Sequence, residues 1–151
     1  CPIVFLYRHA LELCLKALLL ETTTLMQAEG EEPVFPEQLL SKHDLKPLIA
    51  PLQGTFGRFN YSWSLGTCVS CSYEDLLELV EELDRLDSGS YAFRYPVTKS
   101  FKSPSLPRHL RFDLFEFSRR AGKALEGLQA LISRVDSELC AIDDDEEEIQ
   151  E

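Results

Sequence analysis

The sequence predicts an all-α fold, an up-and-down bundle of about four main helices, from three stretches of the chain. Residues 1–27 contain no glycine and, when wound as a helix, are apolar over about three quarters of the circumference. Two later stretches, after Ser72 and after Arg111, repeat apolar residues every three or four positions, which is the spacing of a helix with one buried face. We expect the first helix at the centre of the bundle, because so apolar a surface must be buried on several sides.

The first two expected helices are bounded by proline and aspartate. Pro2 suits a first helical turn, so the first helix is expected to run to about Gln27 and to end before a loop with glycine and prolines. Asp44 is placed to cap a second helix by accepting hydrogen bonds from its first backbone amides. Because proline interrupts helical hydrogen bonding, this helix is expected to be short and to stop or kink near Pro51.

The third and fourth expected helices follow longer connections. A loop of about twenty residues precedes a third helix, which Ser72 caps and Gly89 closes. The next connection is extended and contains prolines, with short strand potential at Tyr91–Tyr95. The last helix is expected from near Arg111 to about Ile142, because apolar residues recur there at helical spacing.

Composition and charge indicate one domain with an acidic end. The chain has 151 residues and a formal net charge of −11. Much of that charge lies in residues 143–151, which we expect to be a disordered tail after a folded domain of residues 1–142. No broad basic face is evident, which argues against non-specific binding of duplex nucleic acid. No apolar run approaches the ~20 residues of a membrane-spanning helix, so no membrane partner is expected. The opening has no leader-peptide pattern and no initiator methionine, and we expect it to continue a longer chain at its amino end.

Cysteine and histidine are too scattered to predict a metal site. Of the five cysteines, only Cys68 and Cys71 form a CxxC pair, whereas structural zinc needs four ligands. A redox CxxC pair belongs to an α/β fold, which this sequence does not predict. Cys14 and Cys140 lie at apolar helix positions, where free cysteine acts as a small hydrophobe. We therefore expect no metal, no cofactor, and reduced thiols in the cytoplasm.

Polar residues gather on one stripe of the first helix. Arg8, His9, Glu12 and Lys16 lie within about a quarter of its circumference. With a histidine, a carboxylate and two cations, such a group could carry acid–base or phosphate chemistry. It is also the pattern of an ion-pair ladder, because Glu12 lies one turn from both Arg8 and Lys16. Before the second helix, His43 is placed to tie its loop to this first helix.

The chain resembles the HEPN superfamily, in particular bacterial stand-alone HEPN-type proteins with an RHxxELxLK first helix and a following HDL. The resemblance rests on the segments YRHALELCLKALLL, HDLKPLI and FRYP, in that order, before a long final helix. The matching residues are Arg8, His9, Glu12, Leu13, Leu15 and Lys16, then His43, Asp44 and Leu45, then Phe93, Arg94, Tyr95 and Pro96. The resemblance implies a helical bundle, often a homodimer, that works in RNA cleavage, toxin–antitoxin pairs or anti-phage defence.

The usual Arg-x4-6-His ribonuclease motif of that family is absent, because Arg8 is followed directly by His9 and Arg108 directly by His109. We therefore expect a module of a bacterial defence or toxin–antitoxin system that acts mainly by binding protein or RNA, and not an enzyme. The alternative is a metal-independent endoribonuclease whose arginine and histidine meet in space, and a third reading is a structural domain of an unrelated larger protein. The catalytic candidates are Arg8, His9, Glu12, Arg94 and His109. The binding candidates are Lys16, His43, Asp44, Tyr95, Lys99, Lys102, Arg108 and Arg111, several of them basic or aromatic as single-stranded RNA requires.

Overall fold

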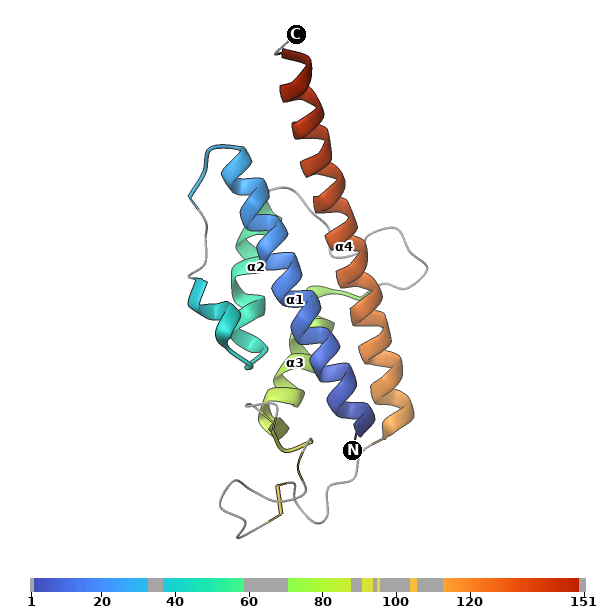
Figure 1. Cartoon of the computed structure of the whole chain (residues 1–151). Helices are drawn as coiled ribbons and strands as arrows, with labels where there is room; N and C mark the ends of the chain where they lie inside the picture. Colours follow the sequence, from blue (N-terminus) through green and yellow to red (C-terminus); the bar gives the residue numbers. More distant parts are fainter. Residues whose placement is uncertain are drawn as a thin grey trace.

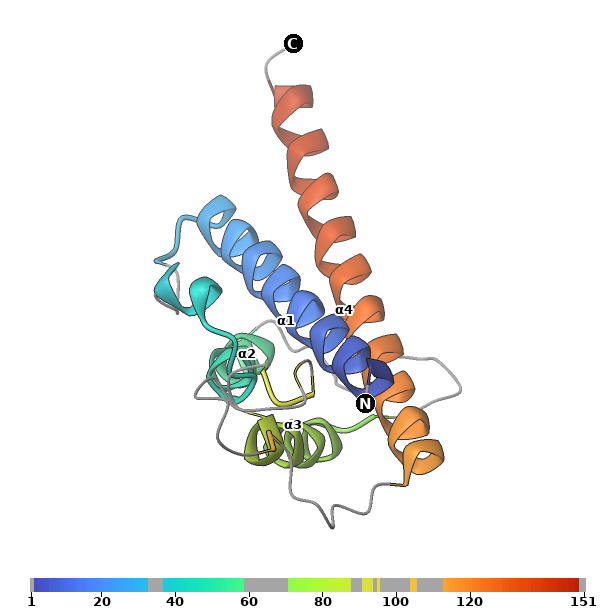
Figure 2. The same ribbon diagram turned by 60° about the horizontal axis from the view of Figure 1, so that its bottom comes forward.

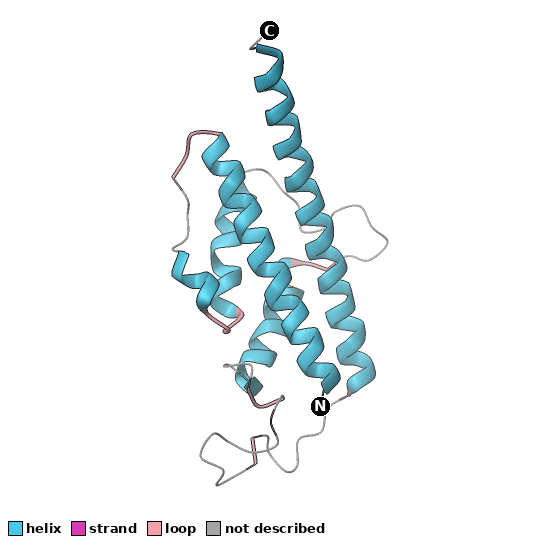
Figure 3. Cartoon of the chain, viewed as in Figure 1, coloured by secondary structure: helices cyan, strands magenta, loops and turns pink. Residues whose placement is uncertain are grey.

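The computed structural model describes residues 2–32, 37–58, 71–87, 91–93, 95, 104–105 and 113–149. They form, in order, α1 (Pro2–Ala28), the 3-10 helix η1 (Glu37–Ser41), α2 (Lys46–Arg58), α3 (Tyr73–Asp87) and α4 (Leu114–Ile149). The described residues contain no β-strand (Figure 3). The all-α helical bundle predicted from the sequence is therefore confirmed. None of the described helices has both the length and the apolar character required to cross a bilayer.

The four α-helices form a closed ring of neighbours around one core (Figure 1). Each contacts the next along the chain, and α4 closes the ring by packing along α1, the most extensive helix contact among the described residues. Figures 1 and 2 show α1 and α4 beginning at the same end and running side by side in the same direction, so this pair departs from strict up-and-down alternation. The carboxyl end of α4 projects beyond the end of α1.

The core is built on α1, as its apolar surface predicted. The buried apolar residues of α1 are Val4, Leu11, Leu15, Leu18, Leu19, Leu25 and Met26. Those of α4 are Phe117, Ala121, Ala124, Leu128, Leu131 and Val135, and their spacing confirms the predicted amphipathic stripe. Two charged residues of α1, Arg8 and Glu12, are also buried, and they form the centre of the candidate site.

α2 differs from the prediction because it continues through Pro51 to Arg58. A proline inside a helix removes one backbone hydrogen bond and costs about 3 kcal/mol. Burial beyond the proline offsets that cost, since Leu52 and Phe56 are almost fully buried and such side chains contribute about 1.5–3 kcal/mol each. The Thr55 hydroxyl also donates to the Pro51 carbonyl oxygen at 3.2 Å. Tertiary packing thus overrides the local stop signal.

α4 begins and ends later than predicted. The Asp113 carboxylate caps it by accepting a hydrogen bond from the Glu116 N–H at 3.0 Å, so the helix begins one residue after Asp113 and not near Arg111. It ends at Ile149 and not near Ile142, so most of the stretch that we expected to be a disordered tail is helical. Glutamate is a good helix former, and extending an existing helix costs far less than starting one.

α3 begins as predicted, with Ser72 as its cap. The Asp75 N–H donates to Ser72 Oγ at 3.1 Å, and the Ser72 N–H donates to Asp75 Oδ2 at 3.0 Å. This reciprocal pair is a capping box in which aspartate takes the place of the more common glutamate. Gly89, which was expected to close the helix, lies outside the described residues.

The segment after α3 forms a turn where the sequence suggested a strand. The Asp87 carboxylate accepts hydrogen bonds from the backbone N–H groups of Tyr91, Ala92 and Phe93, at 2.6, 2.7 and 3.1 Å. The Tyr95 N–H donates to the Tyr91 carbonyl oxygen at 3.0 Å, which closes a single turn. Because Asp87 occupies three successive amides, they cannot form the inter-strand hydrogen bonds of a sheet.

Candidate functional site

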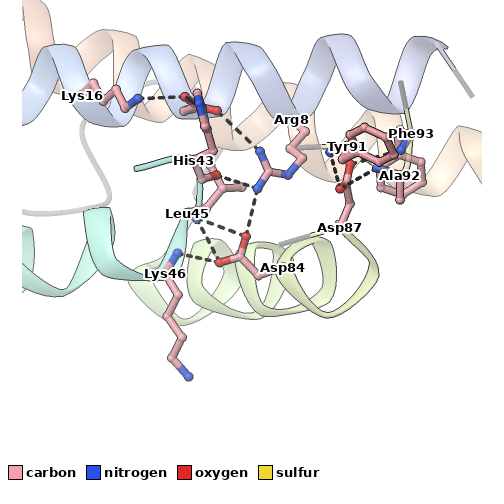
Figure 4. Close-up of polar contacts among 11 residues, drawn as sticks. Arg8, Lys16, His43, Leu45, Lys46, Asp84, Asp87, Tyr91, Ala92 and Phe93 are labelled. Carbon is pink, nitrogen blue, oxygen red and sulfur yellow. Dashed lines mark hydrogen bonds and ion pairs between the residues drawn. The ribbon is translucent and has the colours of Figure 1, made fainter. Parts of the chain in front are cut away.

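Arg8 is a cation in the interior of the bundle, with 0% of its side chain exposed. Its Nη2 donates hydrogen bonds to the His43 carbonyl oxygen at 2.7 Å and to Asp84 Oδ1 at 3.2 Å. Its Nη1 lies 3.5 Å from Glu12 Oε2. Figure 4 shows these groups converging from α1, from α3 and from the segment between η1 and α2. The guanidinium therefore joins three parts of the chain.

Glu12 is the second buried charge, one helical turn from Arg8. Lys16 Nζ donates to its Oε1 at 2.8 Å, and His43 Nδ1 lies 3.0 Å from the same oxygen. Burial is the largest single influence and raises the pKa of Glu12, but the hydrogen bonds and charges of Lys16 and His43 together outweigh it. The pKa of Glu12 is consequently held below its ordinary value, so the group is a carboxylate at neutral pH. The ion-pair ladder predicted from the helical spacing is present, and so is the expected tie from His43 to the first helix.

Asp84 of α3 performs the capping that the sequence assigned to Asp44. Its carboxylate accepts hydrogen bonds from the Leu45 N–H at 3.0 and 3.1 Å and from the Lys46 N–H at 2.8 Å (Figure 4). α2 begins at Lys46, so its amino-terminal cap comes from another helix. The prediction that Asp44 is the cap is therefore wrong. The Asp84 carboxylate thus contacts both amides and Arg8. The partial positive charge at the amino end of α2 favours a negative charge at this position.

The charges of this network balance within it. Two cations, Arg8 and Lys16, meet two carboxylates, Glu12 and Asp84. Removing one partner of a buried ion pair typically costs about 3–5 kcal/mol, because the other charge is left buried and unpaired. The network therefore acts as a clamp that holds α1, α2 and α3 in register. It leaves Arg8 no surface with which to contact a substrate phosphate.

His9 is not part of the network. Its ring stacks on the ring of Phe5, with centroids 5.8 Å apart and 6° between the ring planes. No hydrogen bond among the described residues joins His9 to Arg8 or Glu12. The adjacent arginine and histidine of the sequence therefore have different surroundings, Arg8 in the core and His9 half-buried at the surface.

Some of the remaining candidate residues lie within the part of the chain that the structure describes, and the others lie outside it. Tyr95 is described, with 45% of its surface exposed and its ring centroid 4.6 Å from that of Tyr91. Asp44 is half-buried before α2. The candidates that lie outside the described residues are Arg94, Lys99, Lys102, Arg108, His109 and Arg111.

Two acidic residues of α3 were missed by sequence reasoning, although one carries a signal. On a helical wheel, Asp87 falls in the middle of the apolar stripe of Leu76, Val80 and Leu83, where a carboxylate needs a buried partner. Asp84 falls at the edge of the same stripe. An acidic residue on an apolar helix face is thus the sequence pattern that identifies Asp87, the carboxylate that binds the turn after α3.

The described residues hold no group of three histidine, cysteine, aspartate or glutamate side chains arranged for a metal ion. Cys68 of the CxxC pair lies outside them, and Cys71 is a buried free thiol. No family model, curated protein or solved structure matches the chain.

Proposed function

We propose that the protein is a HEPN-like module of a bacterial defence or toxin–antitoxin system that works in the cytoplasm by binding protein or RNA, and does not cut RNA. The burial of Arg8 carries this proposal. An arginine that stabilises a reacting phosphate must place its guanidinium against that phosphate. Arg8 instead has no exposed surface and is held by His43, Asp84 and Glu12.

Releasing Arg8 toward a substrate would be costly. The movement would break its contacts to Asp84 and Glu12, leaving Asp84 without its cation and Glu12 with one cation fewer. Breaking one buried pair already costs about 3–5 kcal/mol, a large part of the ~5–15 kcal/mol that stabilises a typical domain. A catalytic role for Arg8 would therefore unfold the helix junction that positions it.

The exposed face of α1 supports a homodimer as the form in which the module works. Its large apolar residues Ile3, Leu6, Leu13 and Leu20 are between 46% and 61% exposed. With Ala10 and Ala17 between them, they repeat at spacings of three and four, which is the pattern of a helix that packs on another helix.

Two copies of this row are complementary when they meet antiparallel. If Ala10 of one copy faces Leu13 of the other, Leu6 faces Ala17 and Ile3 faces Leu20, so a small residue faces a large one in the middle of the row and large residues meet at its ends. Burying the exposed half of four such side chains in each copy contributes about 6–12 kcal/mol. This is similar to the ~4–15 kcal/mol that association costs, so we expect a weak dimer that depends on concentration.

RNA cleavage tests the proposed function. Purified protein is incubated with labelled single-stranded and structured RNA in the presence of a chelator, beside a His9→Ala/His109→Ala double variant. We expect no cleavage by either protein, with both folded. Cleavage by the wild type alone would establish the metal-independent endoribonuclease and overturn the proposal.

Light scattering tests the dimer separately. Wild-type protein is expected to approach twice its monomer mass of 17.2 kDa as its concentration rises. Leu13→Glu places a charge in the middle of the α1 row and is expected to give a monomer at all concentrations. Gln129→Glu adds the same charge to an exposed position of α4 and is expected to leave the dimer intact. Equal masses for the two variants would contradict an interface on α1.

A further inference from the structure

A small polar pocket lies between the start of α3 and the first turns of α4. Its volume is about 120 Å³. The described residues that line it are Cys71, Asp75, Arg119, Arg120 and Lys123. The two helices approach closely beside it, since a Cβ at position 127 of α4 would lie 3.8 Å from the Cys71 Cβ. None of these residues belongs to the Arg8 network.

The two arginines are held in place by glutamates outside the pocket lining. Arg119 donates from Nε and Nη2 to the two carboxylate oxygens of Glu116. Arg120 donates from Nη1 to Glu82 at 2.8 Å. Its Nη2 atom is buried, makes no hydrogen bond and lies 3.9 Å from Glu78. Arg120 is thus fixed in position by two glutamates, and its buried Nη2 is not in contact with the open space of the pocket.

Lys123 is not held by a glutamate as the two arginines are. It makes no hydrogen bond or ion pair with the described residues, although its charge acts on Asp75 and Cys71. Asp75, the one carboxylate among the described lining residues, is already engaged with Ser72, and these hydrogen bonds lower the pKa of Asp75. Burial, reinforced by the charge of Asp75, raises the pKa of the Cys71 thiol. At neutral pH this thiol is therefore uncharged and does not repel an anion.

The shape and the donors of the pocket suit a small oxyanion. The backbone amides that begin α3 add partial positive charge beside Cys71 and Asp75. A volume of about 120 Å³ is well below the ~300–1,000 Å³ of pockets for drug-sized ligands. Guanidinium and ammonium donors are the groups that hold phosphate oxygens in proteins.

We propose that this pocket binds a terminal phosphate group through Lys123, with the charges of Arg119 and Arg120 beside it. The nearby carboxylates of Glu78, Glu82 and Glu116 are as many as the three cations of the pocket, so only weak binding is expected, with a dissociation constant on the order of millimolar. The site does not depend on the proposed function, since a phosphate can bind there whether or not the protein binds RNA.

The test titrates the full chain with inorganic phosphate, with a nucleoside 5′-monophosphate, and with a short RNA that carries either a 5′-phosphate or a 5′-hydroxyl. Binding is followed by the NMR shifts of the backbone amides of Cys71 and Lys123. Lys123→Gln removes one pocket cation. Arg134→Gln is the matched control, because it removes the same charge from an exposed position of α4 outside the pocket.

We expect phosphate and the monophosphate to shift these amides, with binding weakened at least ~10-fold by Lys123→Gln and changed less than ~2-fold by Arg134→Gln. Absence of shifts in the wild type would overturn the proposal, as would equal weakening by both variants. Should Lys123→Gln not fold, Lys123→Arg must retain binding and Arg119→Gln must weaken it. Tighter binding of the monophosphate than of free phosphate would assign the site to nucleotides. Preference for the 5′-phosphorylated RNA would assign it to RNA ends.

Discussion

Asp84 combines two structural roles in one carboxylate, and its replacement has a predictable cost. Asp84→Ala removes the cap from the Leu45 and Lys46 amides, which costs about 1 kcal/mol. It also removes a charge-assisted hydrogen bond to the buried Arg8, which contributes about 1.5–3 kcal/mol. We predict that Asp84→Ala lowers the free energy of unfolding by about 2.5–4 kcal/mol.

Asp44→Ala is the matched control, because the local sequence pattern selects Asp44 as the cap. We expect it to cost less than about 0.5 kcal/mol, as at other positions without such contacts. Asp84→Asn is expected to fall between the two, since asparagine still caps a helix but cannot neutralise Arg8. The assay is urea unfolding followed by far-UV circular dichroism, with equal m-values among the variants. A greater loss for Asp44→Ala than for Asp84→Ala would refute the cap and the clamp together.

Glu12, Pro51 and Asp87 give three further predictions. The pKa of Glu12 is lower in the folded protein than its ordinary value of 4.5. The ionised carboxylate of Glu12 therefore contributes fully to the free energy of unfolding above pH 4.5, and this contribution is lost as pH falls through the lowered pKa. Below about pH 4.5 the unfolding free energy should therefore fall more steeply for wild type than for Glu12→Gln, and parallel curves would contradict this. Pro51→Ala restores a backbone hydrogen bond in α2 and should raise the thermal midpoint by several degrees; a lower midpoint would count against an uninterrupted α2. Asp87→Ala should speed hydrogen exchange at the Tyr91 and Phe93 amides, whereas unchanged exchange would exclude the turn around Asp87.

The features predicted correctly from the sequence have local causes. Apolar spacing over a few turns predicts the helices and the central place of α1. The ladder from Arg8 through Glu12 to Lys16 needs only the geometry of one helix. The Ser72 cap is likewise decided within four residues.

The features that the sequence did not predict depend on contacts between distant residues. Asp84 lies 39 residues from Leu45, so no local window contains both the cap and the helix that it caps. Pro51 is a local stop signal, but the packing of Leu52 and Phe56 on the rest of the bundle decides the outcome. The phosphate pocket joins α3 to α4 in the same way, through residues that no motif connects.

The unfolding free energy of Arg8→Met tests most directly whether Arg8 is a buried structural cation and not part of an RNA-cleaving site. We predict a loss of about 3–5 kcal/mol relative to wild type, because Asp84 is left without its cation and Glu12 loses one of its cations. Arg134→Met, which removes an exposed arginine of α4, should cost less than about 0.5 kcal/mol. An Arg8→Met protein as stable as wild type would contradict the structural role of Arg8. If the wild type cut RNA and this equally stable variant did not, Arg8 would instead be part of an RNA-cleaving site.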